Sequence, residues 1–308
     1  MATQEYQEFE NSILDCFNEC TSLFWNDVLY TDVEAFQPRP TRNPNGRTGG
    51  ECRTDVYVSL RQNGQEMDCI KISAKMANWE FLVNKLQPHD AESLFGDGWS
   101  SIIESHTNSI EALFSQKDIL YKSGSEIRFT LGWRLDVTKS SSRELLVPLT
   151  LSTEDIRNKV FRGCELPDHR RNANVNGIVI DDSGVADYLL QQQEGDEGFT
   201  DVSSLIASMD LLSTYEPPTI YLAFVASNYR IKADKVEGSR CLAVRVDWSV
   251  EDNKLTSSLK FNQPLEHKGT TDVLPVLRQA FNEVGIHPSN FDADSIRDFN
   301  IDSIYTRP

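Results

Sequence analysis

The chain has 308 residues, a formal net charge of −17 at pH 7 and six cysteines. This length allows a hydrophobic core in one large domain or in two of ordinary size. The cysteines are scattered, with no CxxC pair and no Cys/His cluster at zinc spacing, so we expect free thiols in a reducing cytosol. The N-terminus lacks the basic start and apolar run of a signal peptide, and no apolar stretch is long enough to cross a bilayer. These features predict a cytoplasmic protein without a membrane partner.

The acidic composition limits what the protein binds. Affinity for nucleic acid comes largely from Lys and Arg side chains that release counterions from phosphates, so the net charge disfavours nonspecific binding. Basic groups are nevertheless present at Arg39, Arg42 and Arg47 and again at residues 169–171. One interpretation is a basic cleft within an acidic surface, and the other is a pair of solvated loops.

The N-terminal part of the chain predicts a helix followed by a loop. Apolar side chains recur at helical spacing within residues 4–30, where Phe9, Ile13 and Phe17 fall on one face. Residues 37–50 are rich in Pro, Gly and Asn, which neither a helix nor a central strand accommodates. We therefore expect an amphipathic helix over residues 4–30 and a loop over residues 37–50.

A β-hairpin is predicted next. Residues 54–60 and 68–74 both alternate apolar and polar side chains, as strands with one buried face do. The turn residues Asn63 and Gly64 lie between them, and Asn-Gly is a strong signal for a tight hairpin turn. Helical spacing returns at residues 78–86 and 101–114.

The second half of the chain is dominated by predicted strands. Alternation or enrichment in β-branched and aromatic residues predicts strands at residues 126–137, 144–151, 176–180, 219–227 and 241–248. Helices are predicted at residues 153–161 and 274–284, and a polar surface loop at 191–201. The pattern indicates an α+β fold with a mixed β-sheet flanked by helices, divided into a core at 1–125 and a β-rich second region at 126–308.

The hairpin carries the residues with the clearest chemistry. Asp55 opens its first strand, and Ser73 and Lys75 end its second, within ECRTDVYV and IKISAKMANWEFLVNKL. Over residues 51–85 this arrangement resembles the PD-(D/E)xK nuclease superfamily, which includes many type II restriction endonucleases. The residue order in ISxKxxNxxFLxN is also similar to restriction-type nucleases encoded by bacteria and phages.

The resemblance implies a restriction-endonuclease-like core that hydrolyses duplex DNA with Mg²⁺. Asp55 is then a metal ligand, and Lys75 orients or activates the attacking water. Mg²⁺ suits such a site because it takes oxygen ligands, keeps several waters and makes a bound water a better nucleophile. A homodimer is also implied, since enzymes that cut palindromic sequences are often dimeric.

The second acidic ligand of the family pattern is replaced by Ser73, which carries no negative charge. Glu80, on the helix predicted after the strand, is the first candidate to supply the missing carboxylate and to bind the metal with Asp55. Glu51, or a glutamate of the N-terminal helix such as Glu10 or Glu19, is the alternative, and the sequence leaves the choice open.

Candidate DNA contacts follow from side chains that bind phosphates or base edges. Arg and Asn side chains can form two hydrogen bonds to guanine and adenine, respectively. Basic residues beside an aromatic residue are suited to binding the sugar-phosphate backbone of a nucleic acid. The candidates are Asn78, His169, Arg170, Arg171, Asn172, Asn174, Arg230 and Lys232.

A second function remains open at this stage. Asp55 could cap a turn in an ordinary hairpin, and the net charge suits a noncatalytic acidic protein that binds a basic partner or mimics DNA. Such a protein, phage-encoded in this interpretation, would keep the fold of the nuclease without its acidic centre.

Overall fold

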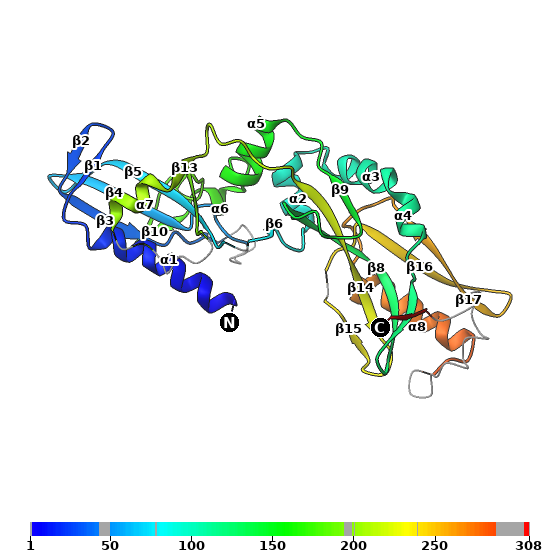
Figure 1. Ribbon diagram of the computed structural model, residues 1–308. Coiled ribbons are helices and arrows are strands. Elements are labelled where there is room, and N and C mark those ends of the chain that lie inside the picture. Colours follow the sequence, from blue (N-terminus) through cyan, green and yellow to red (C-terminus); the bar gives the residue numbers. More distant parts are fainter. Residues whose placement is uncertain are drawn as a thin grey trace. The chain divides into compact units, whose positions relative to one another are not determined.

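The computed structural model describes residues 2–42, 50–77, 79–193, 199, 201–238, 240–287 and 305–307. They form an α+β fold of two compact units, each assembled from two segments of chain (Figure 1). Unit 1 comprises Met1–Glu80 and Leu151–Pro218, and unit 2 comprises Phe81–Thr150 and Thr219–Pro308. The α+β class agrees with the prediction, but the two units differ from the predicted division at residues 125 and 126.

Unit 1 is built on a mixed five-stranded sheet in the order β13-β12-β5-β4-β3. Its strands are β3 (Asp32–Phe36), β4 (Val56–Gln62), β5 (Gln65–Lys75), β12 (Tyr188–Gln191) and β13 (Met209–Leu211). Strand β12 runs parallel to β5, whereas the other neighbours are antiparallel. The helical segments of this unit are α1 (Ala2–Asn18), α5 (Thr153–Asp155), the π-helix η1 (Ile156–Arg162), α6 (Asp168–Arg171) and α7 (Val202–Ala207).

The predicted hairpin is confirmed as β4 and β5. Gln62 pairs with Gln65, so the loop is the two residues Asn63 and Gly64, with φ angles of 54° and 75°. Positive φ at both central positions is the conformation of a type I′ turn, whose twist matches that of the strands it joins. The turn therefore sets the register of the hairpin.

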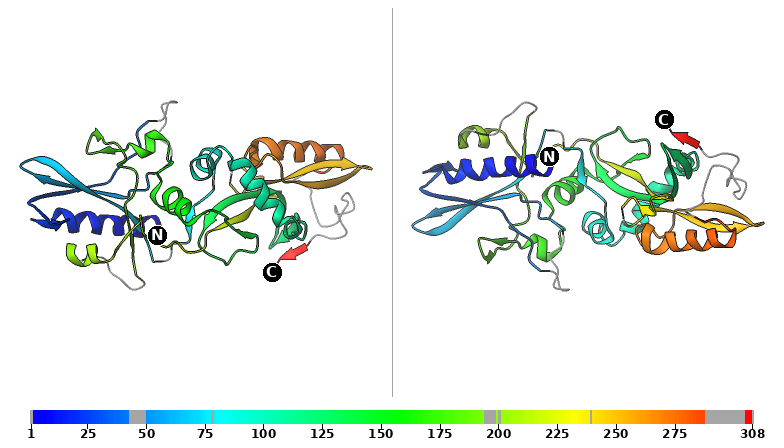
Figure 2. Two further views of the ribbon diagram at one scale, coloured as in Figure 1. Left: turned by 90° about the horizontal axis from the view of Figure 1, so that it is seen from above. Right: turned by 90° about the horizontal axis from the view of Figure 1, so that it is seen from below.

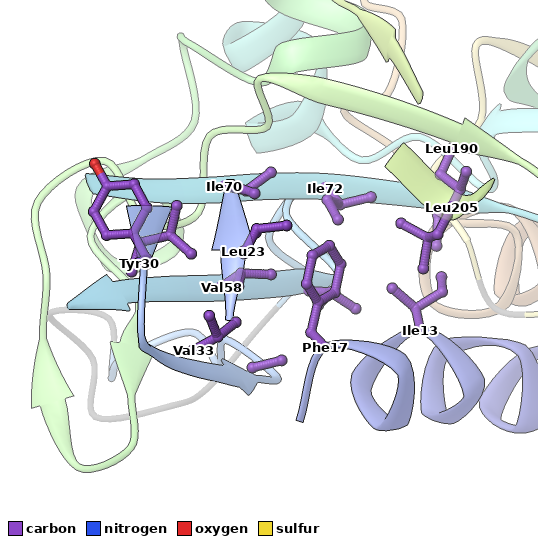
Figure 3. Close-up of a cluster of buried hydrophobic side chains, with 14 of the residues drawn as sticks. Ile13, Phe17, Leu23, Tyr30, Val33, Val58, Ile70, Ile72, Leu190 and Leu205 are labelled. Carbon is purple, nitrogen blue, oxygen red and sulfur yellow. The ribbon is translucent and has the colours of Figure 1, made fainter. Parts of the chain in front are cut away.

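One face of the sheet in unit 1 carries its hydrophobic core. Ile13 and Phe17 of α1 and Leu205 of α7 pack against Ile70 and Ile72 of β5 (Figure 3). Their side chains are all fully buried. The apolar side chains that recur at helical spacing in α1 thus pack against those that alternate along β5.

Helix α1 is shorter than predicted. It ends at Asn18, and residues that were expected on its last turns form a hairpin of β1 (Leu23–Trp25) and β2 (Val28–Tyr30). Asn26 and Asp27 make the turn with positive φ, a conformation that Asn and Asp tolerate better than most residues. The preference of Asn26 and Asp27 for a turn therefore prevails over the helical pattern of apolar residues, which continues beyond Asn18.

The second segment of unit 1, Leu151–Pro218, consists of short helices and strands. Ser152 caps α5 by accepting a hydrogen bond from the Asp155 amide at 3.0 Å. The strand expected at residues 176–180 is only the short β11 (Ile178–Val179), which pairs with β10 (Asn174–Val175). Ile178 and Val179 are exposed, so this apolar stretch is no core strand.

Unit 2 contains a nine-stranded sheet along the path β15-β14-β8-β16-β17. These strands are β8 (Glu126–Thr138), β14 (Tyr221–Arg230), β15 (Lys235–Val236), β16 (Val244–Glu251) and β17 (Lys254–Lys260), joined by β6 (Phe81–Val83), β7 (Leu120–Ser123), β9 (Leu146–Pro148) and β18 (Tyr305–Arg307). The helical segments are α2 (Pro88–Phe95), α3 (Trp99–Ser109), α4 (Glu111–Ser115), the π-helix η2 (Gly269–Val273) and α8 (Leu274–Glu283). Helix α8 packs on β16 (Figure 2). Within the chain that the structure describes, no helix is both long and apolar enough to cross a membrane.

The prediction of a helix at residues 78–86 is wrong. Residues 79–80 are irregular, and β6 follows them, with Phe81 paired to Thr138 and Val83 to Val137 of β8. Asn78 lies outside the described residues. Apolar residues at this spacing were ambiguous by themselves, and pairing with β8, more than fifty positions away in sequence, decides their conformation.

Candidate active site

The hairpin brings Asp55, Ser73 and Lys75 together, as the sequence predicts. Asp55 directly precedes β4, and its amide donates to the Ile72 carbonyl at 2.8 Å. Its carboxylate Oδ2 accepts three hydrogen bonds from the end of β5, and the donors are Ala74 N at 2.7 Å, Ser73 Oγ at 3.2 Å and Lys75 Nζ at 3.3 Å. The carboxylate is therefore fixed in position by a backbone amide and two side chains.

Asp55 and Lys75 form a partly buried ion pair. Their side chains are 17% and 23% exposed, and Lys75 Nζ also donates to the Ala74 carbonyl at 3.0 Å. A pair that is largely shielded from water interacts more strongly than an exposed surface pair. The ammonium is thus held beside the carboxylate and still reaches solvent.

Helix α1 adds a second carboxylate to this site. Glu10 is only 5% exposed, and burial, followed by the charge of Asp55, raises its pKa to about 7. The Gln37 side-chain amide donates to Glu10 Oε2 at 2.8 Å and acts in the opposite direction, as does the charge of Lys75. Near neutral pH, Glu10 therefore exchanges a proton readily beside the charged Asp55.

Tyr6 lies one helical turn before Glu10 and links α1 to the end of β5. Its phenol oxygen donates to the Ala74 carbonyl at 3.1 Å. Burial raises the pKa of Tyr6 far above its usual range, and the charges of Asp55, Glu10 and Glu51 act in the same direction. The phenol accordingly stays neutral and serves as a hydrogen-bond donor.

Tyr6, Glu10 and Asp55 face a pocket of about 320 Å³ in unit 1. It is lined by Tyr6, Gln7, Glu10, Gln37, Pro38, Pro40, Glu51, Cys52, Thr54 and Asp55. Glu10 and Asp55, which approach each other from α1 and from the start of β4, both face it. The pocket is therefore a concave, acidic surface assembled from residues far apart in sequence.

The structure favours Glu10 over Glu80 as the second carboxylate. Glu80 was expected on a helix, but it lies in the irregular connection before β6 and does not line the pocket. Glu51 lines the pocket but is exposed, and Glu19 is exposed beyond the end of α1. Sequence spacing held a signal for Glu10, because it stands on the same helical face as Ile13 and Phe17 and so had to be buried among apolar side chains.

The basic group at residues 169–174 is tied into the fold of unit 1. Arg170 is 4% exposed, and its side chain packs on Gly50. Arg171 Nε pairs with Asp182 Oδ1 at 2.8 Å, and the Asn172 side chain accepts from the Asp182 amide at 3.0 Å. Buried Arg170 is thus poorly placed for the DNA contact that the sequence suggested.

The other residues of this group have mixed surroundings. The His169 carbonyl accepts from the Thr41 amide at 2.7 Å, which ties α6 to the loop at residues 37–42. The Asn174 side chain accepts from the Gly177 amide at 2.9 Å and so closes the β10–β11 turn. The partly exposed His169 and Arg171 stay candidates for DNA contacts.

Arg230 and Lys232 belong to unit 2. Arg230 ends β14, and Lys232 is exposed, with its amide donating to Glu126 Oε1 at 2.8 Å. Lys232 lines a pocket of about 460 Å³ together with Tyr229, Asp234 and Arg278. DNA contact by these two residues stays a prediction.

Over the residues that the structure describes, no three His, Cys, Asp or Glu side chains gather as a metal-binding group. The acidic site offers two carboxylates at its centre, Glu10 and Asp55, and an ammonium at Lys75. Comparisons of the chain with protein-family models, with curated proteins and with solved structures found no match.

Proposed function

We propose that the pocket beside Asp55 is the active site of a Mg²⁺-dependent DNA endonuclease of the PD-(D/E)xK type. The observation that carries this proposal is the hydrogen-bonded pair of Asp55 and Lys75, 3.3 Å apart, beside the buried carboxyl of Glu10. Glu10 and Asp55 line the pocket and Lys75 pairs with Asp55, and two carboxylates with a nearby lysine suit the hydrolysis of a phosphodiester with a divalent cation.

Glu10 and Asp55 fit a divalent cation. Burial, and after it the charge of Asp55, raises the pKa of Glu10 to about 7, and a positive charge in this pocket would offset the repulsion between the two carboxylates. Mg²⁺ needs one or two carboxylates when water and substrate phosphate supply its remaining oxygens. Bound there, the ion would supply an activated water and offset negative charge on the phosphate. Glu10 takes the role first expected of Glu80.

The surrounding side chains have separate tasks in this proposal. The Lys75 ammonium offsets charge that develops on the scissile phosphate and orients the attacking water. Ser73 Oγ and the Ala74 amide hold the carboxylate of Asp55, so Ser73 acts as a positioning residue rather than a ligand. Gln37 holds Glu10 by its hydrogen bond of 2.8 Å.

Cleavage of duplex DNA of diverse sequence with Mg²⁺ or Mn²⁺ tests the proposal. We expect Asp55→Asn, Lys75→Met and Glu10→Gln to lower the single-turnover rate by about 100-fold or more, since each removes a charge at the reacting phosphate. Glu5→Gln is the matched control, because Glu5 is an exposed glutamate of the same helix. Full activity in the three site variants, or no cleavage by the wild type, would contradict the proposal.

The net charge of −17 favours a second candidate, a noncatalytic acidic protein that binds a basic partner or mimics DNA. In that case the wild type cleaves no DNA with either cation. Its partner binding weakens steeply with salt, and Asp55→Asn leaves the affinity unchanged because a broad acidic face, rather than one pocket, makes the contact. The two candidates therefore differ in the response of the protein to a single substitution.

A further inference from the structure

Unit 2 has a pocket of its own, with a volume of about 460 Å³. It lies between helix α8 and the turn that follows β14, because Lys232 and Asp234 of the turn and Arg278 and Asn282 of the helix all line it. Among the described residues of the lining, two are cations, Lys232 and Arg278, and one is a carboxylate, Asp234. The lining therefore offers more positive than negative charge.

The guanidinium of Arg278 is held in place from two sides. It donates to Asp234 Oδ1 and lies 5.6 Å from the centroid of the Tyr229 ring. Tyr229 is fully buried, and its phenol donates to the same oxygen of Asp234 at 2.8 Å. The Arg278 side chain nevertheless stays 48% exposed, and a guanidinium has more N–H donors than these contacts use. Arg278 thus presents fixed donors to a ligand in the pocket.

Lys232 adds a second cation that solvent can reach. Its side chain is exposed and makes no ion pair within the part of the chain that the structure describes. Its backbone is fixed, because its amide donates to Glu126 Oε1 at 2.8 Å. Asn282, an exposed amide, stands four residues after Arg278 and therefore lies on the same face of α8. The pocket thus combines two cations and a neutral donor at one concave surface.

These groups suit a phosphate. The fork of a guanidinium matches two phosphate oxygens at once, and a lysine ammonium adds a flexible point charge. A chain with a net charge of −17 repels anions over most of its surface, so an anion binds where the local charge is positive. Asp234 does not cancel this charge, because Arg278 already neutralises it and Lys232 is left over.

We propose that this pocket of unit 2 binds a phosphate group, with hydrogen bonds from Arg278 and with Lys232 offsetting its charge. The phosphate belongs either to a nucleic-acid strand or to a small molecule such as inorganic phosphate, since both present the same charged oxygens. The proposal goes beyond the function proposed above, which concerns the pocket beside Asp55 in unit 1.

The combined substitution Lys232→Gln and Arg278→Gln tests the proposal. The whole chain is titrated with a short fluorescent DNA duplex at several salt concentrations, with a chelator present so that no divalent cation supports cleavage. The matched control combines Arg240→Gln and Lys254→Gln, because these exposed cations of unit 2 lie outside the pocket lining. Both double variants change the net charge equally and differ in where the charge is removed.

For a nucleic-acid ligand we expect the pocket variant to weaken duplex binding about tenfold, whereas the control pair stays within about twofold of the wild type. The slope of log affinity against log salt should fall by about two in the pocket variant, since two phosphate contacts are lost. Arg278→Lys keeps the positive charge and should keep the slope.

For a free phosphate we expect a different result. Calorimetric titration with inorganic phosphate then shows binding to the wild type and the control pair, and about tenfold weaker binding to the pocket variant, whose affinity for the duplex is unchanged. Melting temperatures verify that every variant is folded. If the pocket variant unfolds, Lys232→Gln alone replaces it, because this exposed side chain has no ion pair to lose among the described residues, and about half of the change in slope is expected.

The proposal is wrong if the pocket variant binds both the duplex and inorganic phosphate as the control pair does, or if the wild type binds neither. Cleavage with Mg²⁺ is scored separately. A wild type that cleaves DNA, with pocket and control variants that bind alike, keeps the nuclease and removes the phosphate site of unit 2. Absence of cleavage, with weaker binding by the pocket variant alone, has the opposite meaning.

Discussion

At the scale of single residues, the chemistry of this protein depends on where Glu10 is buried. A carboxyl group at 5% exposure loses most of its hydration, and the neighbouring Asp55 adds repulsion, so the proton stays on Glu10 up to about pH 7. Asp55 has the opposite surroundings, with three donors around one oxygen. The two carboxyl groups of this pocket therefore differ in their surroundings, Glu10 by its burial and Asp55 by its three hydrogen-bond donors.

The raised pKa of Glu10 makes stability depend on pH. The folded protein holds this proton up to about pH 7, whereas an unperturbed glutamate loses it near the ordinary value of 4.5. The stabilisation that the proton provides is therefore complete below about pH 4.5 and lost as the pH rises to about 7. Above about pH 7 the ionised, buried carboxylate of Glu10 lowers the stability of the folded protein.

We therefore expect Glu10→Gln to raise the melting temperature relative to the wild type by about 5 °C at pH 8 and hardly at all at pH 5. Thermal unfolding without divalent cations at the two pH values measures the difference. Glu5→Gln, on the exposed face of α1, should show no such change with pH. An equal effect of Glu10→Gln at both pH values would show that Glu10 carries no raised pKa.

At the scale of elements, the site depends on Gly184, which approaches α6 closely and joins it to the segment before β4. The Gly184 carbonyl accepts from the amides of Arg53 and Thr54, at 2.9 and 3.2 Å, while its own amide donates to Arg171 at the end of α6. A Cβ at Gly184 would lie 1.9 Å from the Arg170 carbonyl oxygen. Only glycine allows this approach, which fixes the backbone next to Asp55.

Gly184→Ala should lower the free energy of unfolding by about 3 kcal/mol or more, because the clash is with backbone rather than with a flexible side chain. Gly64→Ala is the matched control. Gly64 has a φ of 75° with nothing near its Cβ, so only the backbone strain of the turn remains, and we expect a cost of about 1 kcal/mol. Urea unfolding measures both, and equal costs would contradict the close approach at Gly184.

At the scale of the whole molecule, each unit is completed by a segment that returns after a long excursion of the chain. Strand β12 pairs in parallel with β5, placing Leu189 beside Ser73 and Gln191 beside Lys75. Leu190 of β12 and Leu205 of α7 complete the core of unit 1 (Figure 3). The strand that carries Lys75 is therefore supported by residues more than a hundred positions later in the sequence.

This arrangement predicts which parts of the chain fold alone. A fragment of residues 1–125 lacks β12, β13 and α7, so we expect it to unfold without a cooperative transition. A chain that joins residues 1–80 to 151–218 through a flexible Gly/Ser linker contains all of unit 1 and should unfold cooperatively. Circular dichroism during urea unfolding distinguishes the two, and cooperative unfolding of the fragment 1–125 would show that the later segment is dispensable.

Local patterns in the sequence determined much of the secondary structure and the centre of the candidate site. The alternation around Asn63 and Gly64 fixes the hairpin, and the hairpin register brings Asp55 to Ser73 and Lys75. These features are local, because turn geometry and side-chain periodicity act within a few residues. The α+β class follows in the same way from the mixture of periodicities along the chain.

Only the tertiary structure decided the partners of these elements. Pairing with β8 makes part of residues 78–86 the strand β6 instead of a helix. Each of the two units is assembled from two separate segments of the chain. The tertiary structure also placed Glu10, rather than Glu80, at the pocket with Asp55. Strand pairing and helix packing join residues that are distant in sequence. These contacts are stabilised by surface that is buried between elements, and a short stretch of sequence gives no information about that surface.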